Sequence, residues 1–137
     1  MDTLILPASQ PDALDRALET LQQGGLVAFP TDTVYGLGVL AHDPLSIEQL
    51  FRVKDRESTK AIPVLLGDKA ELESVVVDAS PDALRLAEHF WPGPLTLVLP
   101  RHPYLPEILS PLPTIGVRMP DHPVALGLLR RAGDELP

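Results

Sequence analysis

Short apolar runs alternate along this chain with segments whose apolar residues recur at helical spacing, and glycine or proline separates most of them. Apolar runs of three to seven residues are typical of strands, whereas a repeat of three to four residues indicates a helix. The pattern predicts strands at residues 26–29, 34–40, 62–66, 75–77, 95–99 and 115–119, and helices at residues 13–21, 47–54, 69–73, 83–90 and 123–131. Interleaved helices and strands favour an α/β fold with helices packed on a sheet, but the pattern leaves the strand order open.

Polar residues and glycines mark the expected helix ends. Ser46 begins a run with capping-box spacing, Ser46-Ile47-Glu48-Gln49, and Ser80 directly precedes a proline at the first position of its helix. Gly133 is expected to end the last helix, because glycine is the usual residue just beyond a helix C-terminus. These signals predict where the helices begin and end, but not how they pack.

Composition limits the class of protein. The 137 residues are 45% hydrophobic and contain no linker-like tract, which predicts a single domain over residues 1–137. Cysteine is absent, so disulfides, thiolate metal sites and cysteine nucleophiles are excluded. No apolar run reaches the roughly 18–20 residues of a membrane span, and the N-terminus lacks the basic start of a secretory signal. We therefore expect no membrane association and a cytoplasmic location.

The formal net charge of -8 opposes generic binding to nucleic acid, because that affinity comes mainly from lysine and arginine on phosphates. Four of the 11 basic residues nevertheless lie within nine positions: Arg52, Lys54, Arg56 and Lys60. Such a cluster is typical of a site for a small anion, since Arg and Lys together can hold a polyphosphate. From composition alone a solvated helix end, where bases complement the helix dipole, is the more ordinary interpretation. Composition leaves both interpretations open.

Residues 30–38 form the segment richest in binding groups. It places Thr31, Asp32, Thr33 and two glycines between two predicted strands. Loops held by buried strands often carry ligand contacts, and glycine allows a backbone to approach a ligand closely. The alternative is a turn whose hydroxyls bond only to their own backbone.

Arg118 lies within an otherwise apolar strand. It is either a strand-end residue at the surface or a partly buried cation that needs an anion, because an unpaired buried charge is expensive. Its partner is either a ligand carboxylate or an Asp or Glu of the protein. Thr114 lies four residues earlier, on the same face of the strand if the segment is fully extended.

Several chemistries are not supported by the sequence. There is no Walker motif, so a nucleotide would be held by side chains rather than by a glycine-rich loop. The four histidines have no metal-ligand spacing, and no G-x-S-x-G motif indicates a serine hydrolase.

Four segments together resemble the YrdC family, the threonylcarbamoyl-AMP synthases. They are the run Gly25-Leu26-Val27-Ala28-Phe29-Pro30-Thr31-Asp32-Thr33-Val34-Tyr35-Gly36-Leu37-Gly38, the pair Lys54-x-Arg56, the run Trp91-Pro92-Gly93-Pro94-Leu95-Thr96 and the run Val117-Arg118-Met119-Pro120. The matches come in family order and span nearly the whole chain. The resemblance implies a YrdC-like twisted, mixed α/β sheet with helices packed on it, folded around a concave, locally basic cleft.

The resemblance also implies an activity. Enzymes of this family join L-threonine, bicarbonate and ATP, with Mg²⁺, to form threonylcarbamoyl-adenylate and diphosphate. The product serves N6-threonylcarbamoyladenosine formation at position 37 of tRNA through downstream threonylcarbamoyl-transfer proteins. The implied alternatives are a double-stranded RNA or tRNA-binding module with weak affinity, and a carbamoyl-transfer relative with a different acceptor.

Motif by motif, the resemblance assigns roles to six residues of this chain. Lys54 and Arg56 would be catalytic. Arg56, Lys60 and Thr114 would bind ATP, while Thr33 and Arg118 would bind threonine. No residue is assigned as a metal ligand. Family members continue into a Ser-x-Asn motif that completes the nucleotide site, so we expect this chain to lack the C-terminal strand that carries it.

Overall fold

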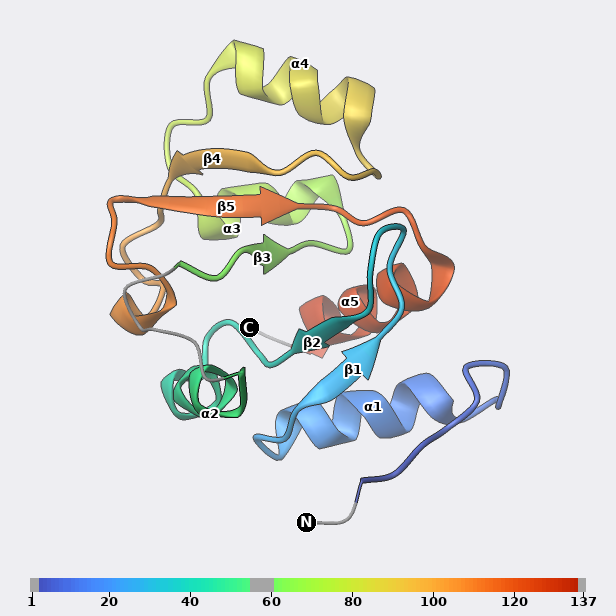
Figure 1. The fold of residues 1–137 in the computed structure, drawn as a ribbon. Coiled ribbons are helices and arrows are strands. Elements are labelled where there is room, and N and C mark those ends of the chain that lie inside the picture. The colour runs from blue at the N-terminus through green and yellow to red at the C-terminus, as the bar shows by residue number, and fades with distance from the viewer. Residues whose placement is uncertain (1–2, 55–60, 136–137) are drawn as a thin grey trace.

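The structure, a computed structural model, describes residues 3–54 and 61–135, without the side chains of residues 134 and 135. The helices are α1 (Ala13–Gln22), α2 (Pro44–Lys54), α3 (Leu72–Val75), α4 (Pro81–Phe90) and α5 (Pro123–Glu135), with 3-10 turns η1 (Lys69–Glu71) and η2 (Glu107–Leu109). The strands are β1 (Val27–Phe29), β2 (Gly36–Gly38), β3 (Val64–Leu65), β4 (Leu97–Pro100) and β5 (Thr114–Arg118). The expected mixed α/β class is confirmed (Figure 1).

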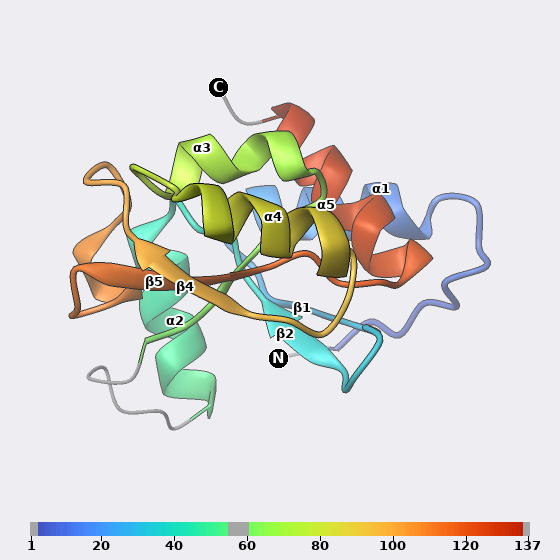
Figure 2. The ribbon, with the colours of Figure 1, turned by 90° about the horizontal axis from the view of Figure 1, so that it is seen from above.

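The strands form two sheets within the described residues. β1 and β2 make an antiparallel hairpin, and β5 lies between β3, to which it is parallel, and β4, to which it is antiparallel. Seen from above, α3, α4 and α5 lie on one side of the three-stranded sheet (Figure 2). The hairpin is therefore a separate element beside the main sheet, and its loop is near the end of β5 (Figure 1).

β5 is the central strand of the core. Ile115 and Val117 are almost fully buried, whereas Thr114, Gly116 and Arg118 on the other face are half-buried. This alternation follows from the pleat of a strand, which turns successive side chains to opposite faces. One face of β5 thus stabilises the fold, and the other is available to form a site.

Two local predictions, the strand at residues 75–77 and the helix end at Gly133, differ from the structure. The predicted strand at residues 75–77 is wrong in part, because Val75 ends α3 and only Val76 forms a bridge, to Arg101. Gly133 does not end the last helix, which continues to Glu135. A Cβ on Gly133 would lie 2.9 Å from the Glu71 carboxylate, so glycine there permits close packing rather than a helix stop.

The N-terminus of α2 also differs from the prediction. The helix begins at Pro44, and Asp43, not Ser46, occupies the capping position. One Asp43 carboxylate oxygen accepts from the Leu45 N–H at 3.1 Å and the Ser46 N–H at 3.4 Å, while the buried Ser46 hydroxyl donates to the other at 2.6 Å. The Ser46 hydroxyl, together with the two N–H groups, holds the pKa of Asp43 below its ordinary value despite the opposing effect of burial.

We expect Asp43→Ala to lower the free energy of unfolding at pH 7 by about 0.5–2 kcal/mol, because helix N–H groups lose their cap. Since folding lowers the pKa of Asp43, its contribution is complete above the pKa of the unfolded chain and disappears as the pH falls through the folded pKa. Urea unfolding of both proteins at neutral and acidic pH measures this. Asp12→Ala is the matched control, because Asp12 precedes α1 without capping it through its side chain. Equal losses for the two variants would contradict the assignment.

Candidate functional site

A cavity of about 360 Å³ lies between the β1–β2 hairpin, β3, α2 and α5. We call it the hairpin cavity, after the hairpin residues 31–41 that form much of its wall. Thr33, Lys54 and Arg118 all line it, although they come from a loop, a helix end and a strand end. The fold therefore brings together three of the six residues to which the sequence assigned a role.

Arg118 is the most connected side chain of this cavity. Its guanidinium donates to the Gly93 carbonyl at 3.1 Å and to the Thr33 hydroxyl at 3.2 Å, and it forms an ion pair with Asp32. The Arg118 and Asp32 side chains are only 14% and 16% exposed. The sequence left two kinds of partner open for Arg118, a ligand carboxylate or an acidic residue of the protein. The structure shows an acidic residue of the protein, Asp32.

The two loop threonines form a directed chain of hydrogen bonds. The Thr31 hydroxyl donates to the Val34 carbonyl, so its single proton is already used. In the Thr31–Thr33 pair, whose oxygens are 3.3 Å apart, Thr33 must therefore be the donor. The Thr33 oxygen then keeps only acceptor capacity, part of which Arg118 uses.

These contacts define which ligand groups the site can address. A guanidinium has five N–H donors, and Arg118 has three partners among the described residues, which leaves donors for a further anionic oxygen. The Thr33 oxygen, which can only accept, suits an ammonium or N–H group. Arg118 can thus donate to a carboxylate, and the neighbouring Thr33 oxygen can accept from an amine. These two groups match the two charged ends of a free amino acid.

Lys54 ends α2, is exposed, and is one of the residues that line the cavity. Arg56 and Lys60 lie outside the described residues. Among the described residues, Lys54 and Arg118 are the lysine and arginine that line the cavity. The charge of Arg118 is already paired with that of Asp32. The locally basic character of the cleft stays a prediction.

Thr114 does not line the hairpin cavity. It begins the five-residue strand that Arg118 ends, so the two Cα atoms are roughly 13 Å apart in an extended strand. Thr114 lies on the same face as Arg118, as expected, and its carbonyl accepts from the Ser110 hydroxyl at 2.9 Å. A role in ATP binding would require a ligand that extends along this face of β5.

The glycines of β2 have a structural role. A Cβ on Gly36 would lie 3.3 Å from the Phe29 ring, and one on Gly38 would lie 3.0 Å from it. Phe29 is buried on the facing strand β1. The Cβ side of both glycines is therefore taken by an aromatic ring, although both residues also line the hairpin cavity.

Two contributors to the site were not assigned from the sequence: the Asp32 side chain and the Gly93 carbonyl. Asp32 is the only acidic residue between Gly25 and His42, a signal that could have identified it as the partner of a buried cation. Nothing in the sequence indicates the Gly93 carbonyl, because any residue carries that group.

No group of three or more potential ligands that could hold a metal ion occurs among the described residues. Asp32, the carboxylate closest to Thr33, is bound to Arg118. The described side chains therefore do not fit a Mg²⁺ site built by the protein, and Mg²⁺ stays a prediction tied to the phosphates of a nucleotide.

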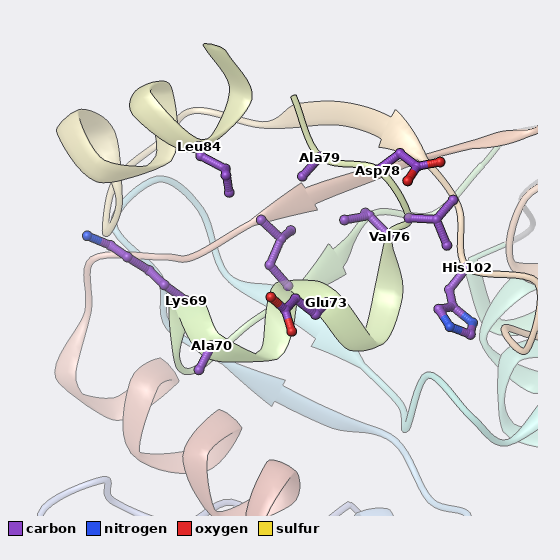
Figure 3. A pocket seen from close by; sticks show the side chains of 10 residues that line it. Lys69, Ala70, Glu73, Val76, Asp78, Ala79, Leu84 and His102 are labelled. Carbon is purple, nitrogen blue, oxygen red and sulfur yellow. The ribbon is translucent and has the colours of Figure 1, made fainter. Parts of the chain in front are cut away.

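A second hollow of about 470 Å³ lies between α3 and the start of α4 (Figure 3). Lys69, Glu73, Asp78 and His102 stand around it, above an apolar floor that includes Val76. None of the residues assigned from the sequence lines this hollow. We therefore do not take it as the candidate functional site.

The described part of the chain contains no helix that is both long and apolar enough to cross a membrane.

Comparison with known proteins identifies the family. The family model Sua5_yciO_yrdC, described as telomere recombination, matches residues 19–136. A threonylcarbamoyl-AMP synthase of Bacillus subtilis is 40% identical over 86% of this chain and 35% of its own length. One from Pyrococcus abyssi is 41% identical over 80% of this chain and 32% of its own length. The chain belongs to the Sua5/YrdC family.

Solved structures agree with this assignment. The P. abyssi Sua5 protein complexed with L-threonine superimposes with a TM-score of 0.85 at 38% identity, over 88% of this chain and 36% of that one. E. coli YciO superimposes with a TM-score of 0.81 at 28% identity, over 90% of this chain and 61% of that one. The expected YrdC-like fold is confirmed. The chain spans about a third of the length of the first curated relatives it matches.

The Asp32–Arg118 pair should stabilise the folded protein measurably. We expect a double-mutant cycle with Asp32→Asn and Arg118→Gln to give a coupling energy of roughly 1–3 kcal/mol, because both side chains are largely shielded from water. Unfolding in urea measures it. The Asp82–Arg85 pair is the matched control: its side chains are 82% and 74% exposed, so its coupling should stay below about 1 kcal/mol. A coupling near zero for Asp32–Arg118 would show that the pair is not formed.

Proposed function

We propose that this chain carries the amino-acid site and part of the nucleotide site of a threonylcarbamoyl-AMP synthase. The reaction forms threonylcarbamoyl-adenylate and diphosphate from L-threonine, bicarbonate and ATP, for N6-threonylcarbamoyladenosine at position 37 of tRNA. The names of the relatives support this proposal, and the threonine complex of P. abyssi Sua5 supports threonine as a ligand. The observation that carries it is the meeting of Arg118 and Thr33 at the hairpin cavity.

Threonine would bind with its carboxylate on the remaining Arg118 donors and its amine near the Thr33 oxygen. Asp32 then has a positioning role, because its ion pair holds the guanidinium beside Thr33. The Gly93 carbonyl fixes the Nε end of the same side chain. Since three partners already orient Arg118, little conformational entropy remains to be lost when the amino acid binds.

The chemistry requires alignment and charge stabilisation rather than a covalent enzyme intermediate. The threonine amine attacks bicarbonate carbon, and loss of water leaves a carbamate. A carbamate oxygen then attacks the α-phosphorus of ATP, and the bond to the diphosphate breaks. Lys54 and Arg56 would offset the negative charge that develops on the leaving diphosphate, and Lys60 and Thr114 would contact the nucleotide. Mg²⁺ bound to ATP would neutralise further phosphate charge.

We expect Thr33→Val to weaken L-threonine binding by about tenfold to a hundredfold, because one hydrogen bond to a charged group is lost. Isothermal titration of threonine into this chain measures the affinity directly. Thr20→Val makes the same chemical change on α1, where the Thr20 hydroxyl bonds only to the Arg16 carbonyl, and it should leave the affinity unchanged. An undiminished affinity in Thr33→Val would rule out the amine contact.

Lys54→Ala and Arg56→Ala should each lower the rate of diphosphate release at saturating threonine, with threonine affinity little changed. The reason is that both cations are assigned to the phosphates rather than to the amino acid. Release of diphosphate from ATP, threonine and bicarbonate is the measurement. Arg52→Ala is the control on the same helix, since Arg52 is exposed and within 3.7 Å of Glu48. Unaltered turnover in both test variants would refute the catalytic assignment.

A further inference from the structure

The turn between α4 and β4 holds the Nε end of Arg118. Gly93 lies in the middle of this turn, and both of its backbone polar groups bond to the end of β5 and the residue after it. The Gly93 carbonyl accepts from Arg118 Nε at 3.1 Å, and the Gly93 N–H donates to the Met119 carbonyl at 2.8 Å. Gly93 and Met119 are buried. The position of the Gly93 carbonyl therefore decides where the guanidinium is anchored.

The same turn passes very close to the end of α4. A Cβ on Gly93 would lie 2.4 Å from the Phe90 carbonyl oxygen, so a larger residue would force the turn to move. Pro92 and Pro94 flank Gly93, and proline has a fixed φ and no N–H. Gly93 thus supplies the one backbone N–H of residues 92–94, and that N–H is already bonded to the Met119 carbonyl.

Trp91 joins the two ends of the turn. Its indole N–H donates to the Leu95 carbonyl at 2.8 Å, so one side-chain hydrogen bond spans residues 91–95. Trp91 is only 3% exposed and belongs to the main apolar core, against which Leu95 packs. A buried N–H needs its acceptor, because leaving it unpaired costs the full desolvation of the group. The indole bond therefore constrains both ends of the turn that carries Gly93.

We propose that Trp91 is a positioning residue for amino-acid binding. Its indole bond fixes the turn, the turn fixes the Gly93 carbonyl, and that carbonyl holds Arg118 Nε so that the remaining guanidinium donors stay beside Thr33. If the Nε end were released, the guanidinium would have to be ordered when a carboxylate binds, and this ordering lowers affinity. The inference rests on the proposed function, because it names a residue that prepares the same site for threonine. It assigns Trp91 no contact with the substrate.

Two replacements of Trp91, the single tryptophan of the chain, remove the donor. Trp91→Phe keeps an aromatic ring without an N–H, and benzothienylalanine at position 91 keeps the shape of the indole with sulfur in place of the N–H. For both, calorimetry should show an L-threonine dissociation constant raised about threefold to tenfold, because Arg118 must be ordered on binding. Diphosphate release at saturating threonine should stay within about twofold of the unaltered rate. Tyr104→Phe is the control, since it removes a polar group from an aromatic side chain that is 87% exposed, and threonine affinity should not change.

Hydrogen exchange of the Arg118 Nε–H, measured by nitrogen-15 NMR, tests the positioning without any ligand. In both replacements this exchange should be at least about threefold faster than in the unaltered protein, because the bond to the Gly93 carbonyl opens more often. Arg118→Lys identifies the resonance, since lysine lacks an Nε–H. The Arg130 Nε–H is the matched control: it donates to the Gly67 carbonyl at 2.9 Å, and its exchange should not change.

Unchanged threonine affinity in the replacements, with folding verified by circular dichroism, would overturn the positioning role. So would weaker affinity with unchanged Arg118 exchange, or a fall in the reaction rate alone. Equal acceleration of exchange at Arg118 and Arg130 would also overturn it, because it would indicate a general loosening of the structure. Absence of threonine binding to the unaltered protein would instead refute the proposed function, and the exchange measurement would still test the connection from the indole to the guanidinium.

Discussion

The guanidinium of Arg118 is the interaction on which the site depends. Through three hydrogen-bonding nitrogens it connects the end of β5 to Asp32 and Thr33 of the hairpin loop and to the Gly93 carbonyl. These segments are far apart in sequence and belong to different elements. A largely buried cation needs such partners, because its desolvation is offset only when its N–H groups are satisfied. The requirement that stabilises Arg118 therefore also positions the hairpin loop beside the main sheet.

Local sequence signals predict the elements of this fold better than their assembly. α4 is an example: Ser80 caps it by accepting from the Ala83 N–H at 3.1 Å, and Pro81 stands in its first turn, as the sequence indicates. The division of the strands into two sheets has no comparable signal, because pairing depends on residues far apart in the chain. Similarly, the sequence identifies Arg118 as a cation that needs a partner, but the choice of Asp32 is made by the fold, across 86 positions.

The glycines show that a sequence pattern can indicate where a small residue matters without indicating which neighbouring group occupies the space beside it. Gly36 and Gly38 make room for the Phe29 ring, and Gly133 lets α5 pass close to Glu71. In the sequence, the first two indicate close approach of a ligand and the third indicates a helix end. At each position a Cβ would come within about 3.3 Å of a neighbouring side chain. The side chain that fills the space beside each glycine comes from a residue that is not its neighbour in sequence. The residues next to the glycine in sequence therefore do not indicate it.

The distribution of ion pairs bears on the proposed site for a small anion in this acidic chain. Among the described residues, Arg52 and Lys69 lie 3.7 and 3.6 Å from Glu48 and Glu88, Arg131 bonds to Asp15 at 3.2 Å, and Arg85 pairs with Asp82. Lys54 has no such partner in the described part of the chain. At physiological ionic strength, charges more than about 8 Å away are largely screened at an exposed surface. An unpaired cation beside the cavity, such as Lys54, would therefore act there largely independently of the net charge. An extended nucleic acid would instead need cations spread over a surface, and five basic residues of the described part of the chain are paired with neighbouring acids.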